Sequence, residues 1–372
     1  MYKTIKRVCT KDNCTGCTAC VSICPVNAIK IIDDLYAYNA IIEPTKCIKC
    51  EKCFKVCPQN NSPKMQEPIE WKQGWVRNQE ERKRSSSGGY ATAIAKAFIE
   101  SGGLVCACVQ VENEFRFILI DQIDKLKRVS GSKYVKSNPI GIFLEVKEQL
   151  KKSKKVLFIG LPCQVAGIIN YLGNDITNKL YTIDLICHGT PSPKLLSLYL
   201  QEEFNKNIGD YLPLRFRKDI HFGLYEGNKK LLKDRLQDKY TLAFLEGIDY
   251  TESCYNCKYA SIKRVSDITL GDSWGTEYIE EMKDGISLAL CQNFKGIELL
   301  KMANVHLYDV DIKKATLSNR QLISPTLKPA KRKLFFNVII KSNKFSRAIW
   351  VAYPKESMKY LIKKMLYFLH LL

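Results

Sequence analysis

Two copies of one cysteine pattern lie close together near the N-terminus of this chain. Each copy has the spacing Cys-x2-Cys-x2-Cys-x3-Cys-Pro, and the eight cysteines are Cys14, Cys17, Cys20 and Cys24 in the first copy and Cys47, Cys50, Cys53 and Cys57 in the second. This spacing is that of bacterial ferredoxins, in which three cysteines of a run hold one 4Fe-4S cluster and the fourth holds the other. The pattern therefore predicts a ferredoxin module with two 4Fe-4S clusters.

Crossed ligation assigns every cysteine of the two runs. One cluster should be held by Cys14, Cys17, Cys20 and Cys57, and the other by Cys47, Cys50, Cys53 and Cys24. A disulfide framework or a pair of zinc knuckles is the alternative, which the repeated four-cysteine spacing disfavours. Residues 28–32 and 40–42 are predicted to form two short strands beside the clusters, and Cys9 is expected to be an ordinary buried thiol.

The rest of the 372-residue chain is long enough for one large or two medium-sized domains. The N-terminus lacks the pattern of a signal peptide, and no apolar run reaches the roughly 18 residues that a membrane span needs. Sixteen cysteines in such a chain favour metal sites in a reducing compartment over disulfides. We therefore expect a cytoplasmic protein.

The formal net charge of +20 predicts that this protein attracts anions. An acidic redox partner protein, a small-molecule electron donor or acceptor, nucleic acid and anionic lipid all fit such a charge. The sequence lacks a recognisable module of basic residues interleaved with stacking aromatics, which disfavours nucleic acid.

Helical and strand patterns alternate after the cysteine runs. A helix is expected at 90–100, strands at 104–111 and 115–120, and then a helix, strand, helix and strand at 142–150, 156–159, 165–172 and 181–186. Strand, helix and strand joined by short turns imply a parallel βαβ unit. The predicted fold class is thus α+β or α/β: a small dicluster ferredoxin module followed by a larger mixed α/β domain.

Four further cysteines are predicted to meet at one edge of that sheet. Cys163 and Cys187 each follow the carboxyl end of a predicted strand, where parallel sheets bind ligands, and Cys254 and Cys257 form another Cys-x2-Cys pair. Together they would hold a third 4Fe-4S cluster or a structural zinc. In the alternative, Cys163 is a lone reactive thiolate with a pKa lowered by a helix N-terminus.

Two small loops are candidates for binding a nucleotide or an isoalloxazine ring. Ser85 to Gly89 begins a helix with backbone N–H groups open to an anion, although a linker ending in a helix cap fits the same residues. Gly131-Ser132-Lys133-Tyr134 offers a cation, a hydroxyl and an aromatic face. By contrast, Cys106, Cys108 and Cys291 are expected to be core residues.

These motifs, taken in order, resemble a known family. They are Ser87-Gly88-Gly89, Gly131 to Val135, Gly160-Leu161-Pro162-Cys163-Gln164, Cys187-His188-Gly189-x-Pro191-Ser192-Pro193, Cys254-x2-Cys257-Lys258-Tyr259 and Asp267 to Gly275. The set is similar to the family of coenzyme F-420 hydrogenase/dehydrogenase beta subunits, in the form fused to an N-terminal ferredoxin with two 4Fe-4S clusters. The resemblance covers roughly residues 1–300.

The resemblance implies an FAD-binding α/β domain that exchanges electrons with iron–sulfur clusters. Its flavin-site candidates are Ser87, Gly88, Gly89, Ser132, Lys133 and Tyr134, and its candidates for an additional cluster are Cys163, Cys187, Cys254 and Cys257. The implied domains are a ferredoxin domain at 1–62, the two parts of the FAD domain at 67–150 and 151–315, and a basic helical tail at 316–372. Residues 59–66 are expected to be a linker.

The sequence departs from the family in two places. A tryptophan expected soon after Arg217 is absent, which puts a deazaflavin substrate in doubt, and the resemblance does not cover the tail. Residues 358–372 of that tail mix apolar and lysine side chains, so they should either dock on a protein surface or lie on an anionic membrane.

Three functions remain as hypotheses. The first is an iron–sulfur flavoprotein oxidoreductase with a substrate of its own, and no catalytic residue is assigned for it. The second is an electron-transfer subunit that serves a partner enzyme, in surface polysaccharide biosynthesis for example. The third is a flavin-free iron–sulfur binding or scaffold protein.

Overall fold

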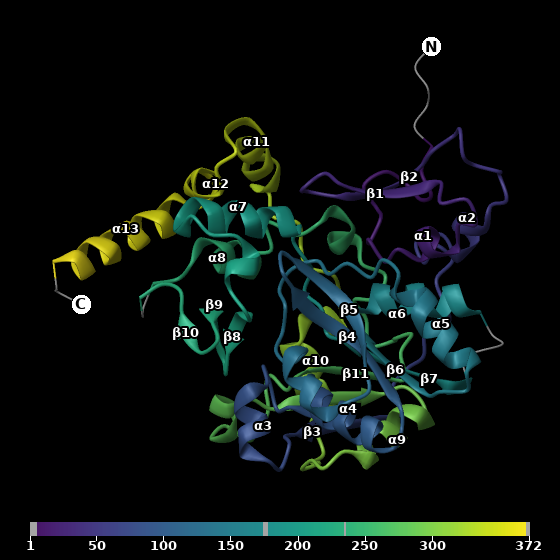
Figure 1. The fold of residues 1–372 in the computed structure, drawn as a ribbon. Coiled ribbons are helices and arrows are strands. Elements are labelled where there is room, and N and C mark those ends of the chain that lie inside the picture. Colours follow the sequence, from purple (N-terminus) through teal and green to yellow (C-terminus); the bar gives the residue numbers. More distant parts are fainter. Residues whose placement is uncertain (1–5, 174–177, 234–235, 370–372) are drawn as a thin grey trace.

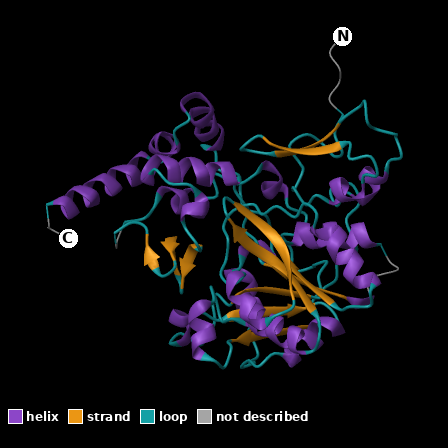
Figure 2. Cartoon of the chain, in the orientation of Figure 1, coloured by secondary structure: helices purple, strands orange, loops and turns teal. Residues whose placement is uncertain are grey.

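A seven-stranded sheet forms the centre of the protein (Figures 1 and 2). The computed structural model describes residues 6–173, 178–233 and 236–369. The strand order is β3-β12-β11-β7-β6-β4-β5, with bounds β3 Glu70–Gly74, β4 Leu104–Val111, β5 Glu114–Ile120, β6 Val156–Gly160, β7 Leu180–Leu185, β11 Ile268–Asp272 and β12 Ser287–Cys291. The strands β4, β6, β7 and β11 are parallel. At the two edges β5 pairs antiparallel with β4, β12 pairs antiparallel with β11, and β3 pairs antiparallel with β12. The mixed α/β class is confirmed.

The predicted βαβ unit is β6, α6 (Pro162–Leu172) and β7. Its two strands are parallel neighbours, with Gly160 opposite Asp184. The helix begins at Pro162, whose fixed φ suits a first turn, and the N–H of Leu161 donates to Oε1 of Gln164 at 2.9 Å. This capping contact fixes the turn in which Cys163 lies.

Helices cover both faces of the sheet. One face packs against α4 (Tyr90–Glu100) and α9 (Phe294–Met302), and the other against α5 (Ile142–Lys151) and α6. The short helix α3 (Gln79–Arg84) precedes α4, and the loop between them is Ser85 to Gly89. Amphipathic patterns predicted α4, α5 and α6, whereas α3 and α9 were not predicted.

The ferredoxin module packs against α5 and α6 (Figure 1). It consists of α1 (Ala19–Ile23), α2 (Lys52–Val56) and the antiparallel strands β1 (Ile29–Asp33) and β2 (Tyr38–Ile42). Its buried cysteines share one hydrophobic core with Phe143 and Phe158 of the α/β domain. Residues 59–66, expected to be a linker, contain no helix or strand. The segment is tied to the α/β domain at its end, where the backbone of Gln66 pairs with that of Arg264 in both directions, at 2.7 and 2.9 Å.

A second small sheet and a group of helices complete the fold. Their bounds are β8 Leu214–Lys218, β9 His221–Glu226, β10 Lys229–Lys230, α7 Pro193–Phe204, α8 Lys239–Leu245, α10 Ile312–Ser318, α11 Arg332–Ser342, α12 Phe345–Ala352 and α13 Pro354–Phe368. Short 3-10 helices are η1 Ile123–Arg128, η3 Ile208–Asp210, η4 Glu252–Asn256, η5 Glu281–Asp284 and η6 Arg320–Leu322. The last part of the predicted tail pattern, 370–372, lies outside the described residues. No described helix combines the length and the apolar character that crossing a membrane requires.

Candidate redox site

The first predicted cluster site is buried on the side of the ferredoxin module that packs against α5 and α6. Cys14, Cys17, Cys20 and Cys57 are each only 5–7% exposed. The charges of Cys17, Cys14 and Cys57 act on Cys20, as does that of Cys53 from the second predicted site. The four thiols of the first site are therefore near one another and also near the second site. The N–H of Gly16 donates to Sγ of Cys14 at 3.4 Å, a kind of contact that tunes a metal centre through its ligand.

The second predicted cluster site is a small cavity of about 20 Å³ near the surface. All four cysteines assigned to it by crossed ligation line this cavity: Cys24, Cys47, Cys50 and Cys53. Cys50 is exposed, and the N–H of Ala28 donates to Sγ of Cys24 at 3.2 Å. The grouping agrees with crossed ligation, and the ligation of individual cysteines stays a prediction.

Cys9 is not the ordinary buried thiol that was expected from the sequence. It is half-buried and contacts the sulfurs of Cys14 and Cys57. Its hydrogen bond lowers the pKa of Cys57 to about 7. The antiparallel pairing of Arg7 with Ile41, together with the hydrogen bond from the N–H of Val8 to the carbonyl of Ala40 at 3.0 Å, brings Cys9 to this position, and no motif in the sequence signals it.

Four further cysteines come together as predicted: Cys163 and Cys187, which follow β6 and β7, and the pair Cys254 and Cys257. The charges of the other three all act on Cys187. The lowered pKa expected for Cys163 is wrong, because burial raises it to about 12 and outweighs the helix N-terminus. Among the described residues, no group of three or more His, Cys, Asp or Glu side chains is placed to hold a metal ion. A third cluster, which is larger than an ion, stays a prediction.

Lys136 is a buried cation that sequence patterns do not reveal. It is 5% exposed and lies between two groups of cysteines. We call them the two inner cysteine groups: Cys14, Cys17, Cys20 and Cys57 in the ferredoxin module, and Cys163, Cys187, Cys254 and Cys257 in the α/β domain. Burial alone would lower its pKa, but Cys254, Cys163, Cys187 and Cys14 act together to raise it. Its position directly after the Gly131 to Val135 motif was the available signal.

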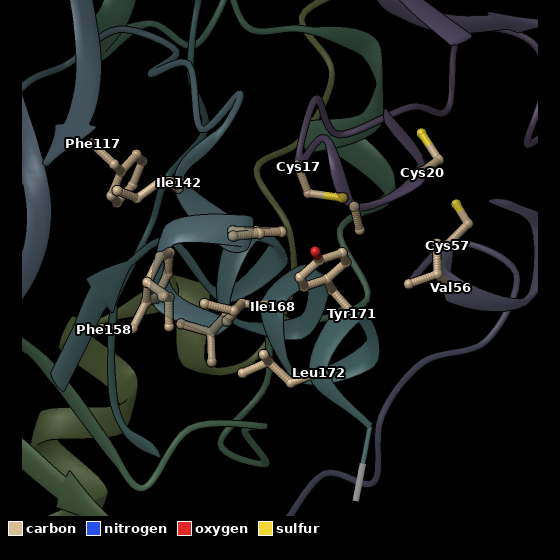
Figure 3. Close-up of a cluster of buried hydrophobic side chains, with 14 of the residues drawn as sticks. Cys17, Cys20, Val56, Cys57, Phe117, Ile142, Phe158, Ile168, Tyr171 and Leu172 are labelled. Carbon is tan, nitrogen blue, oxygen red and sulfur yellow. The ribbon is translucent and has the colours of Figure 1, made fainter. Parts of the chain in front are cut away.

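The two inner cysteine groups are joined through α6. A Cβ atom added to Gly167 would lie 3.0 Å from Cβ and 3.1 Å from Sγ of Cys17. Figure 3 shows Cys17 next to the helix that carries Ile168, Tyr171 and Leu172. Cys163 lies one turn earlier on the same helix, and its charge acts on Cys17.

A cavity of about 410 Å³ opens where the parallel strands end. This volume is in the range of pockets for small ligands and cofactors. The walls include Leu161 after β6, Cys187 after β7 and Asp272 at the end of β11. Ligands bind at this edge of parallel sheets, because loops diverge there.

Both predicted flavin loops border this cavity. Ser87, Gly89, Ser132, Lys133 and Tyr134 line it, and Oγ of Ser86 accepts a hydrogen bond from the N–H of Ser132 at 2.7 Å. Gly88 does not line the cavity. A Cβ atom there would lie 2.3 Å from the carbonyl oxygen of Gly74, so this glycine is required for packing.

The cavity has a cationic wall and an aromatic wall. Burial lowers the pKa of Lys133 to about 8, and its Nζ donates to the carbonyl of Val129. The ring of Tyr134 stacks on that of Phe244 with centroids 4.5 Å apart. Arg217 donates to Asp272 at 2.7 Å, while its Nη2 makes no hydrogen bond in the part of the chain that the structure describes.

Comparison with known protein families agrees with this arrangement. Two adjoining family models, both named for the coenzyme F420 hydrogenase/dehydrogenase beta subunit, match the chain: the N-terminal model at residues 72–144 and the C-terminal model at residues 153–313. The chain belongs to this family. Residues 13–61 match a 4Fe-4S dicluster domain, so this member is an iron–sulfur electron-transfer protein with a ferredoxin module.

Proteins of Methanosarcina and Methanocaldococcus are similar to this chain. The chain is 24% identical over 294 residues to one subunit of the F(420)H(2) dehydrogenase of Methanosarcina mazei, covering 74% of this chain and 81% of the relative. It is 26% identical over 206 residues to an uncharacterised protein of Methanocaldococcus jannaschii, covering 47% and 57%. A chain of the F420-reducing NiFe hydrogenase complex from Methanosarcina barkeri shares the fold, with a TM-score of 0.52, 18% identity and coverage of 75% and 96%.

Proposed function

We propose that this protein is an oxidoreductase that carries electrons between FAD in the 410 Å³ cavity and the iron–sulfur clusters. The observation that carries the proposal is the position of Cys187. This residue belongs both to the wall of the cavity and to the group of Cys163, Cys254 and Cys257. That group in turn adjoins Cys17 of the ferredoxin module.

The residues of the cavity fit a flavin dinucleotide. At the N-terminus of α4 the N–H of Tyr90 donates to Oγ of Ser287 at 3.4 Å. Among the residues that the structure describes, no side chain hydrogen-bonds to the next two N–H groups, those of Ala91 and Thr92, which line the cavity and are open to a phosphate, and Ser87 and Gly89 lie beside them. Lys133 supplies positive charge on the facing loop. Tyr134 offers an aromatic wall for a flat ring.

FAD, when bound, supplies the ability to exchange electrons in pairs with a substrate and singly with a cluster. The protein would hold the flavin and the clusters in place and keep water away from the space between them. Cys163 and Cys187 are only half-exposed, and Lys136 between the inner groups is buried. Arg217, a buried cation of the cavity wall whose Nη2 has no hydrogen-bond partner among the described residues, is a candidate to bind an anionic group of a ligand that reaches it.

Anaerobic purification tests the cofactor content. We expect about one FAD per chain and, with three 4Fe-4S clusters, about twelve iron atoms. The variant Cys163→Ala should lower the iron content to about eight, whereas Cys106→Ala, in the β4 core, should leave it unchanged. About eight iron atoms in the unaltered protein would remove the third cluster, and iron without flavin would remove the FAD site.

A second function has support from the surface of the ferredoxin module. Ile48 and Phe54 are 60% and 54% exposed, and Ile48 lines the cavity of the outer four cysteines. Apolar side chains around an exposed cluster fit a docking site for a partner protein. The chain would then be an electron-transfer subunit.

Stopped-flow mixing separates these two functions. The isolated chain is mixed without oxygen with NAD(P)H, with a reduced deazaflavin and with reduced ferredoxin, and bleaching of its visible absorption is followed. Rapid bleaching by a small molecule supports an enzyme with its own substrate. Bleaching by reduced ferredoxin alone supports electron transfer on behalf of a partner enzyme.

A further inference from the structure

Helix α13 exposes the apolar side of an amphipathic helix. Its outward stripe, which we call the α13 stripe, consists of side chains that are 47–59% exposed: Met358, Leu361, Ile362, Met365 and Leu369. At 3.6 residues per turn these positions fall on one side of the helix. In Figure 1, α13 is the arm that extends away from the rest of the protein at the C-terminal end.

The opposite side of α13 contacts the protein through polar groups. The hydroxyl of Tyr360 donates to Glu203 at 3.2 Å, and Lys364 pairs with the same carboxylate at 3.7 Å. Lys239 lies 5.1 Å from the centre of the Tyr360 ring. A helix on a globular protein ordinarily packs its apolar side inward, so this helix is held in the reverse orientation.

Positive charge is concentrated in the same part of the chain. Residues 328–372 contain eleven Lys and Arg residues and one acidic residue, Glu356, which is half of the net charge of +20. Lys355 and Lys359 are exposed and lie beside the stripe on α13. The family match ends at residue 313, so the tail is additional to the electron-transfer fold.

We propose that α13 lies flat on an anionic lipid surface, with its stripe among the acyl chains and Lys355 and Lys359 at the headgroups. An apolar stripe flanked by lysines, on a helix that cannot cross a bilayer, has the properties of an interfacial helix. Binding to nucleic acid would use the charge but leave the stripe in water. Contact with a second copy of the chain would bring two strongly positive tails together. An anionic bilayer accommodates both features.

Sedimentation with vesicles tests this proposal on the full chain. We expect binding to phosphatidylglycerol/phosphatidylcholine vesicles and little binding to pure phosphatidylcholine. The triple variant Leu361→Gln, Ile362→Gln, Met365→Gln should lower the partition coefficient about a hundredfold, because three partly buried apolar side chains are lost. The matched control is Ile279→Gln, Phe294→Gln, Leu317→Gln, which changes exposed apolar side chains elsewhere and should bind as the unaltered protein does.

A second pair of variants tests the charge. Lys355→Gln with Lys359→Gln should weaken binding to the anionic vesicles about 25-fold, since each cation near the surface contributes about fivefold. Lys151→Gln with Lys152→Gln, also exposed, should have no effect. Circular dichroism checks that each variant is folded.

Three results would overturn the proposal. One is equal binding of the unaltered protein to anionic and neutral vesicles. Another is unchanged vesicle binding by the triple variant, which would indicate adhesion by charge alone. The third is a dimer in light scattering that the triple variant converts to a monomer, because the stripe would then be a contact between copies. Loss of FAD or of a cluster changes none of these readouts, so the proposed function is tested separately.

Discussion

Arg82 should hold in place the loop Ser85 to Gly89, which borders the cavity, and replacing Arg82 by methionine tests this. Arg82, on α3, is 7% exposed and donates twice to the carbonyl of Gly285, at 2.8 and 3.2 Å, and once to the carbonyl of Glu281 at 2.9 Å. It also pairs with the Glu281 carboxylate and lies 4.7 Å from the Trp75 ring centre. The residue after Gly285 is Ile286, and its carbonyl accepts a hydrogen bond from the hydroxyl of Ser87 in the loop at 2.9 Å.

The cost of Arg82→Met follows from which groups lose their partners. The Glu281 side chain is 41% exposed, so water replaces the guanidinium there and the ion pair adds little. A carbonyl that is left buried without a partner costs about 1–3 kcal/mol. Losing the contact with the indole costs about another 0.5–1 kcal/mol. We therefore expect the free energy of unfolding to fall by about 2–4 kcal/mol.

The matched control is Arg84→Met, because Arg84 is exposed on the same helix. It should change the free energy of unfolding by less than about 0.5 kcal/mol. Urea unfolding without oxygen, followed by circular dichroism, measures both variants, and FAD titration should show weaker binding for Arg82→Met alone. If the two variants unfold at the same urea concentration, Arg82 does not hold this loop.

Three further predictions concern the redox site. The amine of Lys133, with a pKa lowered to about 8, is neutral above that pH in the free protein, so a bound phosphate should make it take up a proton. FAD affinity should therefore fall as the pH rises above 8. Calorimetry in two buffers measures the proton uptake. The variant Lys133→Met should abolish this proton uptake. Gly167→Val should overpack the contact with Cys17 and destabilise the fold by about 1–3 kcal/mol. It should also slow reduction of the clusters while FAD still binds. Unchanged rates of cluster reduction would contradict this. Cys50→Ala should remove only the outer cluster, visible as a loss of about four iron atoms per chain with FAD retained.

Local patterns predicted the parts of this protein that depend on residues near one another in the sequence. The cysteine runs fix the ferredoxin module because two-residue gaps turn successive thiols toward one centre. The strand ends of β6 and β7 placed Cys163 and Cys187 together because connections in parallel sheets follow fixed rules. The helix 90–100 was predicted to the residue, since its apolar side and its glycines are explicit.

Features that depend on distant segments were missed or misjudged. Lys136 looks like any surface lysine until the folded chain places cysteines from three segments around it. The backbone pairing of Gln66 with Arg264 was missed, because the composition of residues 59–66 does not reveal it. For Cys163 the helix N-terminus was visible in the sequence, but the burial that raises its pKa was not.

Helix α6 is one of the elements that set the spacing between the ferredoxin module and the cavity. Cys163 at its start belongs to the group that borders the cavity, and Gly167, four residues later, contacts Cys17. Four residues of α-helix rise about 6 Å, and this rise is rigid. The module therefore cannot move along α6 without changing the contact between Gly167 and Cys17. Because a side chain at position 167 would push the module away, the absence of one keeps the inner cluster site close to the cavity.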